Sequence, residues 1–214
     1  SKFLYKRMLK YKYLNDDSVL EMGIDEAGRG PLLGRVYAAA VVLPPKDSFD
    51  ETIIKDSKKF HSKKKIENVS NYIKENALYW SVCYEDEKTI DTINILQATQ
   101  KAMHKCITEI KEKCKEQIFL CVDGNYFNYY KGCNSICVEG GDNQYVAIAA
   151  ASILAKVDRD KYIEELCEEN PGLKEKYSIH TNKGYGAAKH IEGIKKYGIS
   201  EFHRKSFGIC RNYI

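Results

Sequence analysis

The chain has 214 residues, of which 43% are hydrophobic and 30% are charged, and its formal net charge is +4. This apolar fraction excludes an intrinsically disordered chain, and the 14 Gly and 4 Pro are too few for a collagen-like or linker sequence. The apolar runs fall well short of the roughly 18 residues that a membrane-spanning helix needs. We therefore expect a globular protein that does not sit in a membrane.

The first half of the chain predicts strands and helices in alternation. Residues 22–26 and 35–43 read as two neighbouring strands, the second ended by Pro44 and Pro45. Residues 62–76 read as a helix with Ser62 as its N-cap, 78–84 as a third strand, and 89–114 as a second helix with an apolar stripe at helical spacing.

The second half continues the same alternation. Residues 118–122 form a continuous apolar run, which is typical of a strand buried on both faces, and 134–138 predict a fifth strand. Residues 143–169 predict a long helix with an Ala-rich stripe that allows a neighbouring element to approach closely, and 187–197 predict a last helix. This order predicts an α/β protein with a mixed sheet and helices on both faces.

No Gly/Ser or Pro linker divides the chain, so we expect one domain over residues 1–214. Its catalytic core would span about residues 18–170, and residues 171–214 would form a basic C-terminal helical segment that packs on the core. That segment holds nine Lys or Arg against three Glu, and a second cluster of lysines lies between Lys55 and Lys65. Such clusters are either solvated faces or surfaces that bind a polyanion such as a nucleic acid.

The eight cysteines lie mostly inside apolar segments, and no Cys-x-x-Cys pair occurs. None of the five His stands at metal-ligand spacing from a cysteine, which argues against a zinc site and against a redox pair. We therefore expect free thiols and a reducing, intracellular location such as the cytoplasm. Nothing in the pattern calls for an oligomer, and we expect a monomer.

Four acidic residues stand beside glycines where a predicted strand ends or a helix begins: Asp25, Glu26, Asp123 and Asp142. The ends of central strands meet at one edge of an α/β sheet, so Asp25 and Asp123 can come together there. Clustered carboxylates need a cation, and Mg²⁺ or Mn²⁺ takes oxygen ligands of this kind. Two such ions could activate water and stabilise the leaving oxygen of a phosphodiester.

Each of these acids also has a structural interpretation. Asp142 is placed like an N-cap of the long helix, and Asp123 followed by Gly124 is typical of a turn. Asp25 and Glu26 are neighbours on a strand and would point to opposite faces, unless the strand bends or ends between them.

Seven ordered segments carry a family resemblance. They are GIDEAGRGPL at 23–32, DSKK at 56–59, VDGN at 122–125, GD at 141–142 before IAAASILAKV at 148–157, DRD at 158–160, KGYG at 183–186 and HRKSF at 203–207. Together they resemble the type 2 ribonuclease H family, the ribonuclease HII branch in particular. The resemblance implies a ribonuclease H-like mixed five-stranded sheet flanked by helices, with a C-terminal helical extension.

The activity that the resemblance implies is metal-dependent cleavage of RNA in RNA/DNA hybrids and incision 5′ to ribonucleotides embedded in duplex DNA. The products would carry 3′-hydroxyl and 5′-phosphate ends, and the role would be removal of ribonucleotides and RNA primers from DNA. The partner would be the nucleic acid, and the cofactor Mg²⁺ or Mn²⁺, with two ions expected.

Site residues follow from the same resemblance. Asp25, Glu26, Asp123 and Asp142 match the family's metal-binding, catalytic carboxylates. Substrate-binding positions are matched by Gly28, Arg29 and Gly30, which with Tyr185 would read the ribose 2′-hydroxyl, and by Lys58, Ser152, Lys156, His203, Arg204 and Ser206, which would contact phosphates or pack nearby. Asp160 is left out, because Arg159 offers it a simple partner.

Two other functions remain open at this point. A catalytically silent nucleic-acid-binding module would keep the basic surfaces, but it would have no reason to turn four carboxylates toward phosphates. Another ribonuclease H-like nuclease, such as a resolvase or a transposase-type strand-transfer domain, would use similar acids without a ribose sensor.

Overall fold

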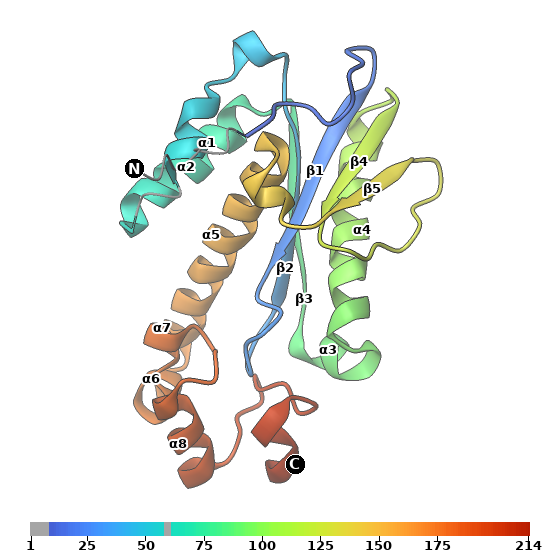
Figure 1. The fold of residues 1–214 in the computed structure, drawn as a ribbon. Helices are drawn as coiled ribbons and strands as arrows, with labels where there is room; N and C mark the ends of the chain where they lie inside the picture. The colour runs from blue at the N-terminus through green and yellow to red at the C-terminus, as the bar shows by residue number, and fades with distance from the viewer. Residues whose placement is uncertain (1–8, 58–60) are drawn as a thin grey trace, which may run out of the picture.

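The computed structural model describes residues 9–57 and 61–214, and at its centre lies a five-stranded sheet (Figure 1). The strand order is β3-β2-β1-β4-β5. The three strands β1, β2 and β3 pair antiparallel, whereas β1, β4 and β5 pair parallel. Their bounds are β1 Leu20–Ala27, β2 Val36–Val42, β3 Tyr79–Glu85, β4 Ile118–Asp123 and β5 Ser135–Val138. The predicted mixed sheet is confirmed.

Helices cover both faces of this sheet (Figure 1). On one face lie α1 Glu51–Ser57, α2 Lys63–Asn76 and α5 Val146–Glu169; on the other lie α3 Glu87–Ile93 and α4 Ile95–Lys113. Met22 and Ile24 of β1 belong to the hydrophobic cluster under α4, while Gly23 between them faces α5. A Cβ on Gly23 would lie 2.2 Å from the carbonyl carbon of Ala147, so β1 and α5 are in backbone contact. The Ala-rich sequence of α5 predicts this close approach.

Two predicted helices are corrected by the structure. The helix predicted over residues 89–114 is broken at Asn94, which has φ 71° and whose side chain caps α4 by accepting a hydrogen bond from the N–H of Gln97 (3.0 Å). The long helix does not begin at residue 143, because Gly141–Asn143 forms a 3-10 turn and α5 starts at Val146. The N-cap of α5 is Tyr145, so the capping role suggested for Asp142 is wrong.

The C-terminal segment folds into three short α-helices and a final 3-10 turn, drawn in orange to red in Figure 1. These are α6 Gly172–Tyr177, α7 Ile179–Asn182, α8 Ala188–Tyr197 and η3 Gly208–Tyr213. Only α8 was predicted, because helices of four to seven residues, including α1, are too short to show a periodic apolar stripe. Buried residues of this segment, such as Leu173 and Ile194, belong to the same hydrophobic cluster as α5.

The structure also bears on the cysteines and on membrane-spanning helices. All eight cysteines lie within the described residues and are free. Across residues 9–57 and 61–214, none of the helices is both long and apolar enough to cross a membrane.

Candidate active site

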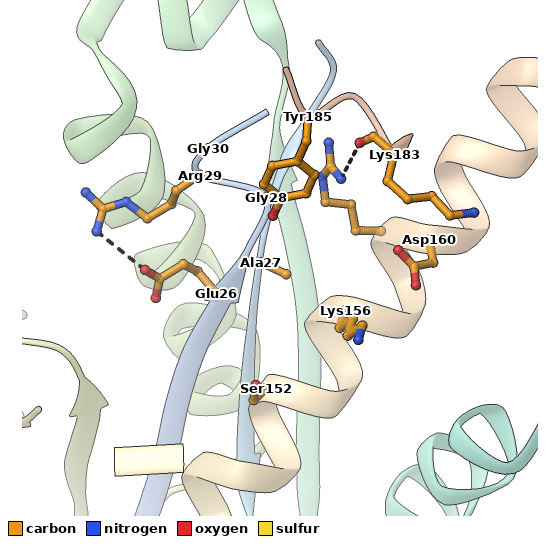
Figure 2. A pocket seen from close by; sticks show the side chains of 11 residues that line it. Glu26, Ala27, Gly28, Arg29, Gly30, Ser152, Lys156, Asp160, Lys183 and Tyr185 are labelled. Carbon is orange, nitrogen blue, oxygen red and sulfur yellow. Dashed lines mark hydrogen bonds and ion pairs between the residues drawn. The ribbon is translucent and has the colours of Figure 1, made fainter. Parts of the chain in front are cut away.

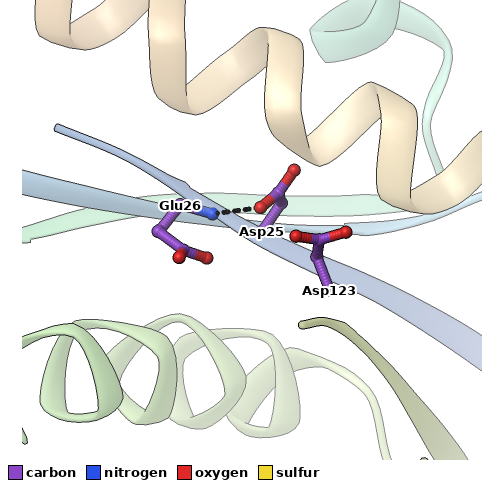
Figure 3. Close-up of side chains that lie close together, drawn as sticks. All are labelled: Asp25, Glu26 and Asp123. Carbon is purple, nitrogen blue, oxygen red and sulfur yellow. Dashed lines mark hydrogen bonds between the residues drawn. The ribbon is translucent and has the colours of Figure 1, made fainter. Parts of the chain in front are cut away.

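Three carboxylates meet at one edge of the sheet, where β1 and β4 end (Figure 3). Asp25, Glu26 and Asp123 each place a carboxylate oxygen within 4.8 Å of the others. The register between the parallel strands β1 and β4 ends at the pair Ile24 and Val122, so Asp25 and Asp123 are the next residue on each strand. The sequence prediction that these two acids converge at the sheet edge is thus matched by the geometry.

The two neighbouring acids of β1 reach this place from opposite faces of the strand. Figure 3 shows the Asp25 side chain on the side of α5 and the Glu26 side chain on the side of α4, as the alternation of a strand requires. The Asp25 carboxylate accepts a hydrogen bond from the backbone N–H of the next residue, Glu26 (2.7 Å). No bend of the strand between the two residues is needed. Both lie beyond the last pair of residues that joins β1 to β4, so side chains from either face of β1 can reach the space beside the end of β4.

Burial and mutual repulsion make this cluster a poor place for several negative charges. Burial, followed by the charges of Asp123 and Glu26, raises the pKa of Asp25 to about 9. Burial also raises the pKa of Glu26, although the Arg29 guanidinium opposes that shift. Among the described residues, the buried Oε2 atom of Glu26 has no hydrogen-bond partner. An all-oxygen donor set with an unsatisfied buried carboxylate atom fits a hard divalent cation.

Asp142 lies beside this cluster and is not one of its three members. Its backbone N–H faces the Oδ1 atom of Asp123 at 3.4 Å, and its negative charge contributes to the raised pKa of Asp25. The turn at Gly141–Asn143 therefore brings Asp142 to the same corner of the molecule, with the side chain beyond the 4.8 Å grouping.

A cleft of about 660 Å³ opens next to Glu26, between the end of β1, α5 and the loop before α8 (Figure 2). Most of the residues that line it have polar or charged side chains, and two are glycines. The lining residues are Glu26, Ala27, Gly28, Arg29, Gly30, Ser152, Lys156, Arg159, Asp160, Lys183 and Tyr185. The structure thus gathers in one cleft seven of the residues that the sequence analysis named from separate motifs.

The Gly28–Gly30 loop is held from behind by two buried arginines. Arg204 donates from its guanidinium to the carbonyl oxygens of Gly28 (2.6 Å) and Arg29 (2.9 Å). Gly28 has φ 88°, and a Cβ there would lie 2.2 Å from the Nε atom of Arg159. Arg159 is itself fixed, because it donates to carbonyl oxygens that include that of Lys183 (2.9 Å). The loop is therefore rigid, and only glycine fits at residue 28.

The Tyr185 side chain continues the wall that the Gly28–Gly30 loop forms, with its ring beside Gly30 (Figure 2). A Cβ on Gly30 would approach the Tyr185 ring to 3.3 Å, so the glycine lets loop and ring come close. The ring is about half exposed, at 49%. The backbone carbonyl of Tyr185 accepts a hydrogen bond from the buried ring of His190 (2.8 Å), which pairs in turn with His203 through their Nε2 atoms (2.9 Å).

One face of α5 supplies three further side chains to the cleft, Ser152, Lys156 and Asp160. They follow one another at intervals of four residues, which places them above one another on a helix. Asp160 was not among the predicted site residues, although its position four residues after Lys156 could have indicated that it lies on the same face of the helix. Burial raises the pKa of Asp160, and the charges of Lys183 and Lys156 oppose that shift.

Three predicted substrate contacts bind protein groups in the structure, and a fourth cannot be placed. The side chains of His203 and Arg204 are buried, at 1% and 0% exposure, and bind protein groups, so in this conformation neither is available to a phosphate. The two residues instead hold the loops of the cleft in position from behind, which is a structural role for this motif. Ser206 is exposed but donates to the carboxylate of Asp91 (2.6 Å). Lys58 lies outside the described residues.

Comparisons with known proteins point to a single family. The family model described as ribonuclease HII matches residues 22–210. A ribonuclease HII of Cytophaga hutchinsonii is 40% identical over 193 residues, which cover 90% of this chain and 91% of the relative. A ribonuclease HII of Bacteroides thetaiotaomicron is 42% identical over 197 residues, covering 92% of this chain and 93% of the relative.

Solved structures are similar in fold. The ribonuclease HII in a complex with PCNA from Archaeoglobus fulgidus has a TM-score of 0.69 and 24% identity, covering 89% of this chain and 96% of that one. Bst-RNase HIII in complex with Mn²⁺ has a TM-score of 0.59 and 16% identity, covering 84% of this chain and 70% of that one. The ordered motifs, the sheet-edge carboxylates and a match along residues 22–210 lead to one conclusion: this chain belongs to the ribonuclease HII family.

Proposed function

We propose that this ribonuclease hydrolyses the RNA strand of RNA/DNA hybrids and incises duplex DNA on the 5′ side of embedded ribonucleotides, leaving 3′-hydroxyl and 5′-phosphate ends. One observation carries the proposal. The carboxylate cluster, in which Asp25 is buried and Glu26 and Asp123 are half-buried, adjoins through Glu26 a cleft whose wall is the backbone of the Gly28–Gly30 loop and the ring of Tyr185. Phosphodiester chemistry and recognition of one sugar can therefore occur side by side.

The Gly28–Gly30 loop is suited to recognising a 2′-hydroxyl. Arg204 occupies the carbonyl oxygens of Gly28 and Arg29 from behind, whereas within the described part of the chain the N–H groups of residues 28–30 donate to no backbone acceptor. These N–H groups can donate to a ribose oxygen, and the exposed face of the Tyr185 ring can pack against the sugar. The 2′-hydroxyl is the group that distinguishes RNA from DNA at one nucleotide.

Asp25, Glu26 and Asp123 would hold the divalent metal, and Asp142 would complete the set. The partner-less Oε2 atom of Glu26 and the convergence of three carboxylates both favour a bound cation there. We propose Mg²⁺ or Mn²⁺, with two ions in the working enzyme. Such ions supply an activated water and stabilise the leaving oxygen of a phosphodiester.

Basic side chains around the cleft would position the nucleic-acid backbone. Lys156 and Lys183 line the cleft itself, and the C-terminal segment adds a surplus of positive charge. Such contacts fix the register of a duplex without reading its sequence. We further propose that the chain acts as a monomer with one domain, because the C-terminal segment and α5 share one hydrophobic cluster. The eight free cysteines support a reducing compartment.

The first test is cleavage of a labelled RNA/DNA hybrid with Mg²⁺, with Mn²⁺ and with chelator, by wild type and by Asp123→Asn. Because the variant keeps the shape but loses a metal-holding charge, we expect its rate to fall at least ~100-fold, while duplex binding persists. The ends of the products are identified by ligation. A near-normal rate for Asp123→Asn would remove Asp123 from the site, and binding without cleavage by wild type would favour a silent binding module.

A further inference from the structure

Residues 124–134 connect β4 to β5, leave the sheet directly after Asp123, and run beside α4 (Figure 1). Two of their aromatic side chains anchor the connection to that helix. The rings of Phe127 and Tyr130 both contact the ring of His104, with centroids 5.3 and 5.2 Å away. The Tyr130 hydroxyl also lies 3.0 Å from the hydroxyl oxygen of Thr108.

The backbone of the connection is fixed at Asn128 by three polar side chains of α4. The N–H of Asn128 donates to the side chain of Gln100 (2.8 Å), and its side-chain amide donates to Gln97 (2.9 Å). Its carbonyl oxygen lies 2.9 Å from the Nε2 atom of His104. A segment held in this way loses little further conformational entropy when it binds a ligand.

The same rigid segment turns two tyrosines outward. Tyr126 is 46% exposed and Tyr129 is 77% exposed. Within the described residues, the structure gives neither hydroxyl a hydrogen bond and neither ring a stacking partner. Burial does not explain why these two positions are aromatic. The contacts of Phe127, Asn128 and Tyr130 fix the backbone that carries both side chains.

The surroundings of these tyrosines carry positive charge and amide groups. Residues 124–138 contain Lys131 and no Asp or Glu. Residues 95–108 of α4 also contain no acid; their Lys101 lies at the groove, whereas Lys105 pairs with Glu85 of β3. A groove of about 430 Å³ beside the segment is lined by Ile93, Gln97, Gln100, Lys101, His104 and Asn128. Lysine, amide and exposed aromatic groups together suit a nucleic-acid strand, because they match phosphates, sugars and base faces.

We propose that this surface, made of Tyr126, Tyr129, Lys101 and the groove beside them and called here the β4–β5 ledge, binds the part of the nucleic-acid substrate that flanks the cleavage site on the α4 side. The Tyr185 cleft is lined by residues of α5 and the ledge by residues of α4, which cover opposite faces of the sheet, and the segment that carries the ledge tyrosines follows directly on Asp123 of the carboxylate cluster. The inference rests on the proposed function, since it concerns the same substrate. The tyrosine rings pack on sugars or bases, and Lys101 contacts a phosphate.

The test measures binding of a labelled DNA duplex with one ribonucleotide in chelator, and its single-turnover cleavage in Mg²⁺. Tyr129→Ala should weaken binding about tenfold, since an aromatic contact with nucleic acid is worth ~1–3 kcal/mol, and the loss should fall on Kd and KM more than on the rate at saturation. Tyr129→Phe keeps the ring and should restore most of the affinity. Tyr13→Ala is the matched control: Tyr13 is also partly exposed, at 40%, but it stacks on Phe119 near the start of β4.

Two further measurements locate the contact. Lys101→Met should lower the slope of log K against log salt by about one. Duplexes shortened stepwise on one side of the ribonucleotide should lose the difference between wild type and Tyr129→Ala once they no longer reach the ledge.

The outcomes separate this inference from the proposed function. If wild type cuts the duplex but Tyr129→Ala binds it as tightly as wild type does, the ledge is not a substrate surface, while the proposed function stands. If Tyr129→Ala and Tyr13→Ala weaken binding equally, the effect is not local and the inference also fails. A wild type that neither binds nor cuts any ribonucleotide-containing duplex would overturn both.

Discussion

Gly28 is confined by its own backbone conformation and by one neighbouring side chain. It has φ 88°, and a Cβ there would overlap the Nε and Cδ atoms of Arg159 at 2.2 and 2.4 Å. Arg159 cannot move away cheaply, because its guanidinium donates hydrogen bonds to three backbone carbonyls, of Leu33, Arg35 and Lys183. At the scale of single residues, the shape of the proposed ribose-binding loop therefore depends on a glycine and on two buried arginines behind it.

Gly28→Ala tests this dependence, with Gly132→Ala as its control. Gly132 also has φ 88°, but no atom lies within 4 Å of the position of its Cβ. Gly132→Ala should cost only the backbone term, about 1 kcal/mol of unfolding free energy. Gly28→Ala should cost at least ~2 kcal/mol, because the overlap with Arg159 adds to that term, and should slow cleavage strongly. Urea unfolding and cleavage rates measure both, and equal costs for the two variants would contradict the proposed constraint.

The sequence alone predicted the clustered carboxylates better than the residues that support the cleft. Asp25, Glu26 and Asp123 stand in recognisable motifs at strand ends, and strand topology brings such ends together. The burial of Arg204 could not be read from its motif, because a basic residue has the same local pattern whether it faces a phosphate or four backbone carbonyls 169 to 176 residues away. Only the tertiary structure distinguishes these two uses of an arginine.

Among the elements, the strands and the helices α2 and α8 were predicted within two residues, whereas the start of α5 and the break between α3 and α4 were missed. The strands are short, mostly apolar runs bounded by Gly, Pro or polar residues, and these signals are local. The break between α3 and α4 was missed because the apolar stripe continues across it in the sequence. Asn94 interrupts the helix by adopting φ 71° and ψ 165°, a conformation that is costly for residues other than glycine.

This break yields a prediction about Asn94, whose side chain caps α4 while its backbone is strained. Asn94→Ala loses the cap and keeps the strain, so the free energy of unfolding should fall by about 1–2 kcal/mol. Asn94→Gly also loses the cap but relieves the strain, and should be as stable as wild type or more stable. Chemical denaturation of the three proteins measures the order, and a glycine variant less stable than the alanine variant would refute the strained break.

For the whole molecule, a buried histidine pair joins the C-terminal segment to the cleft. Ser200 donates its N–H to His203 Nδ1 (2.9 Å), His203 meets His190, and His190 meets the carbonyl of Tyr185. This chain of contacts requires both imidazoles to be neutral, because each ring must accept one hydrogen bond and donate one. Burial, with the neighbouring His190, lowers the pKa of His203 to about 3.

Acidification should therefore destabilise the protein through this pair. The pKa of His203 is lower in the folded state than the usual 6.5, so the unfolded chain binds more protons between pH 6.5 and about 3. The unfolding free energy should then fall as the pH drops through this window, by about 2 kcal/mol from pH 7 to pH 5 for one such histidine. Urea unfolding of wild type and His203→Asn at both pH values measures it, and an unchanged pH dependence in the variant would rule out His203 as its source.

We propose that one site of this ribonuclease combines metal-dependent hydrolysis with recognition of a single ribose. The most direct measurement compares two labelled DNA duplexes that differ only in one 2′-hydroxyl, in Mg²⁺ or Mn²⁺ and in chelator, with the position of any nick mapped. We predict one nick, on the 5′ side of the ribonucleotide, which depends on the metal and is absent from the all-DNA duplex. Cutting of both duplexes, or of neither while both still bind, would contradict the claim.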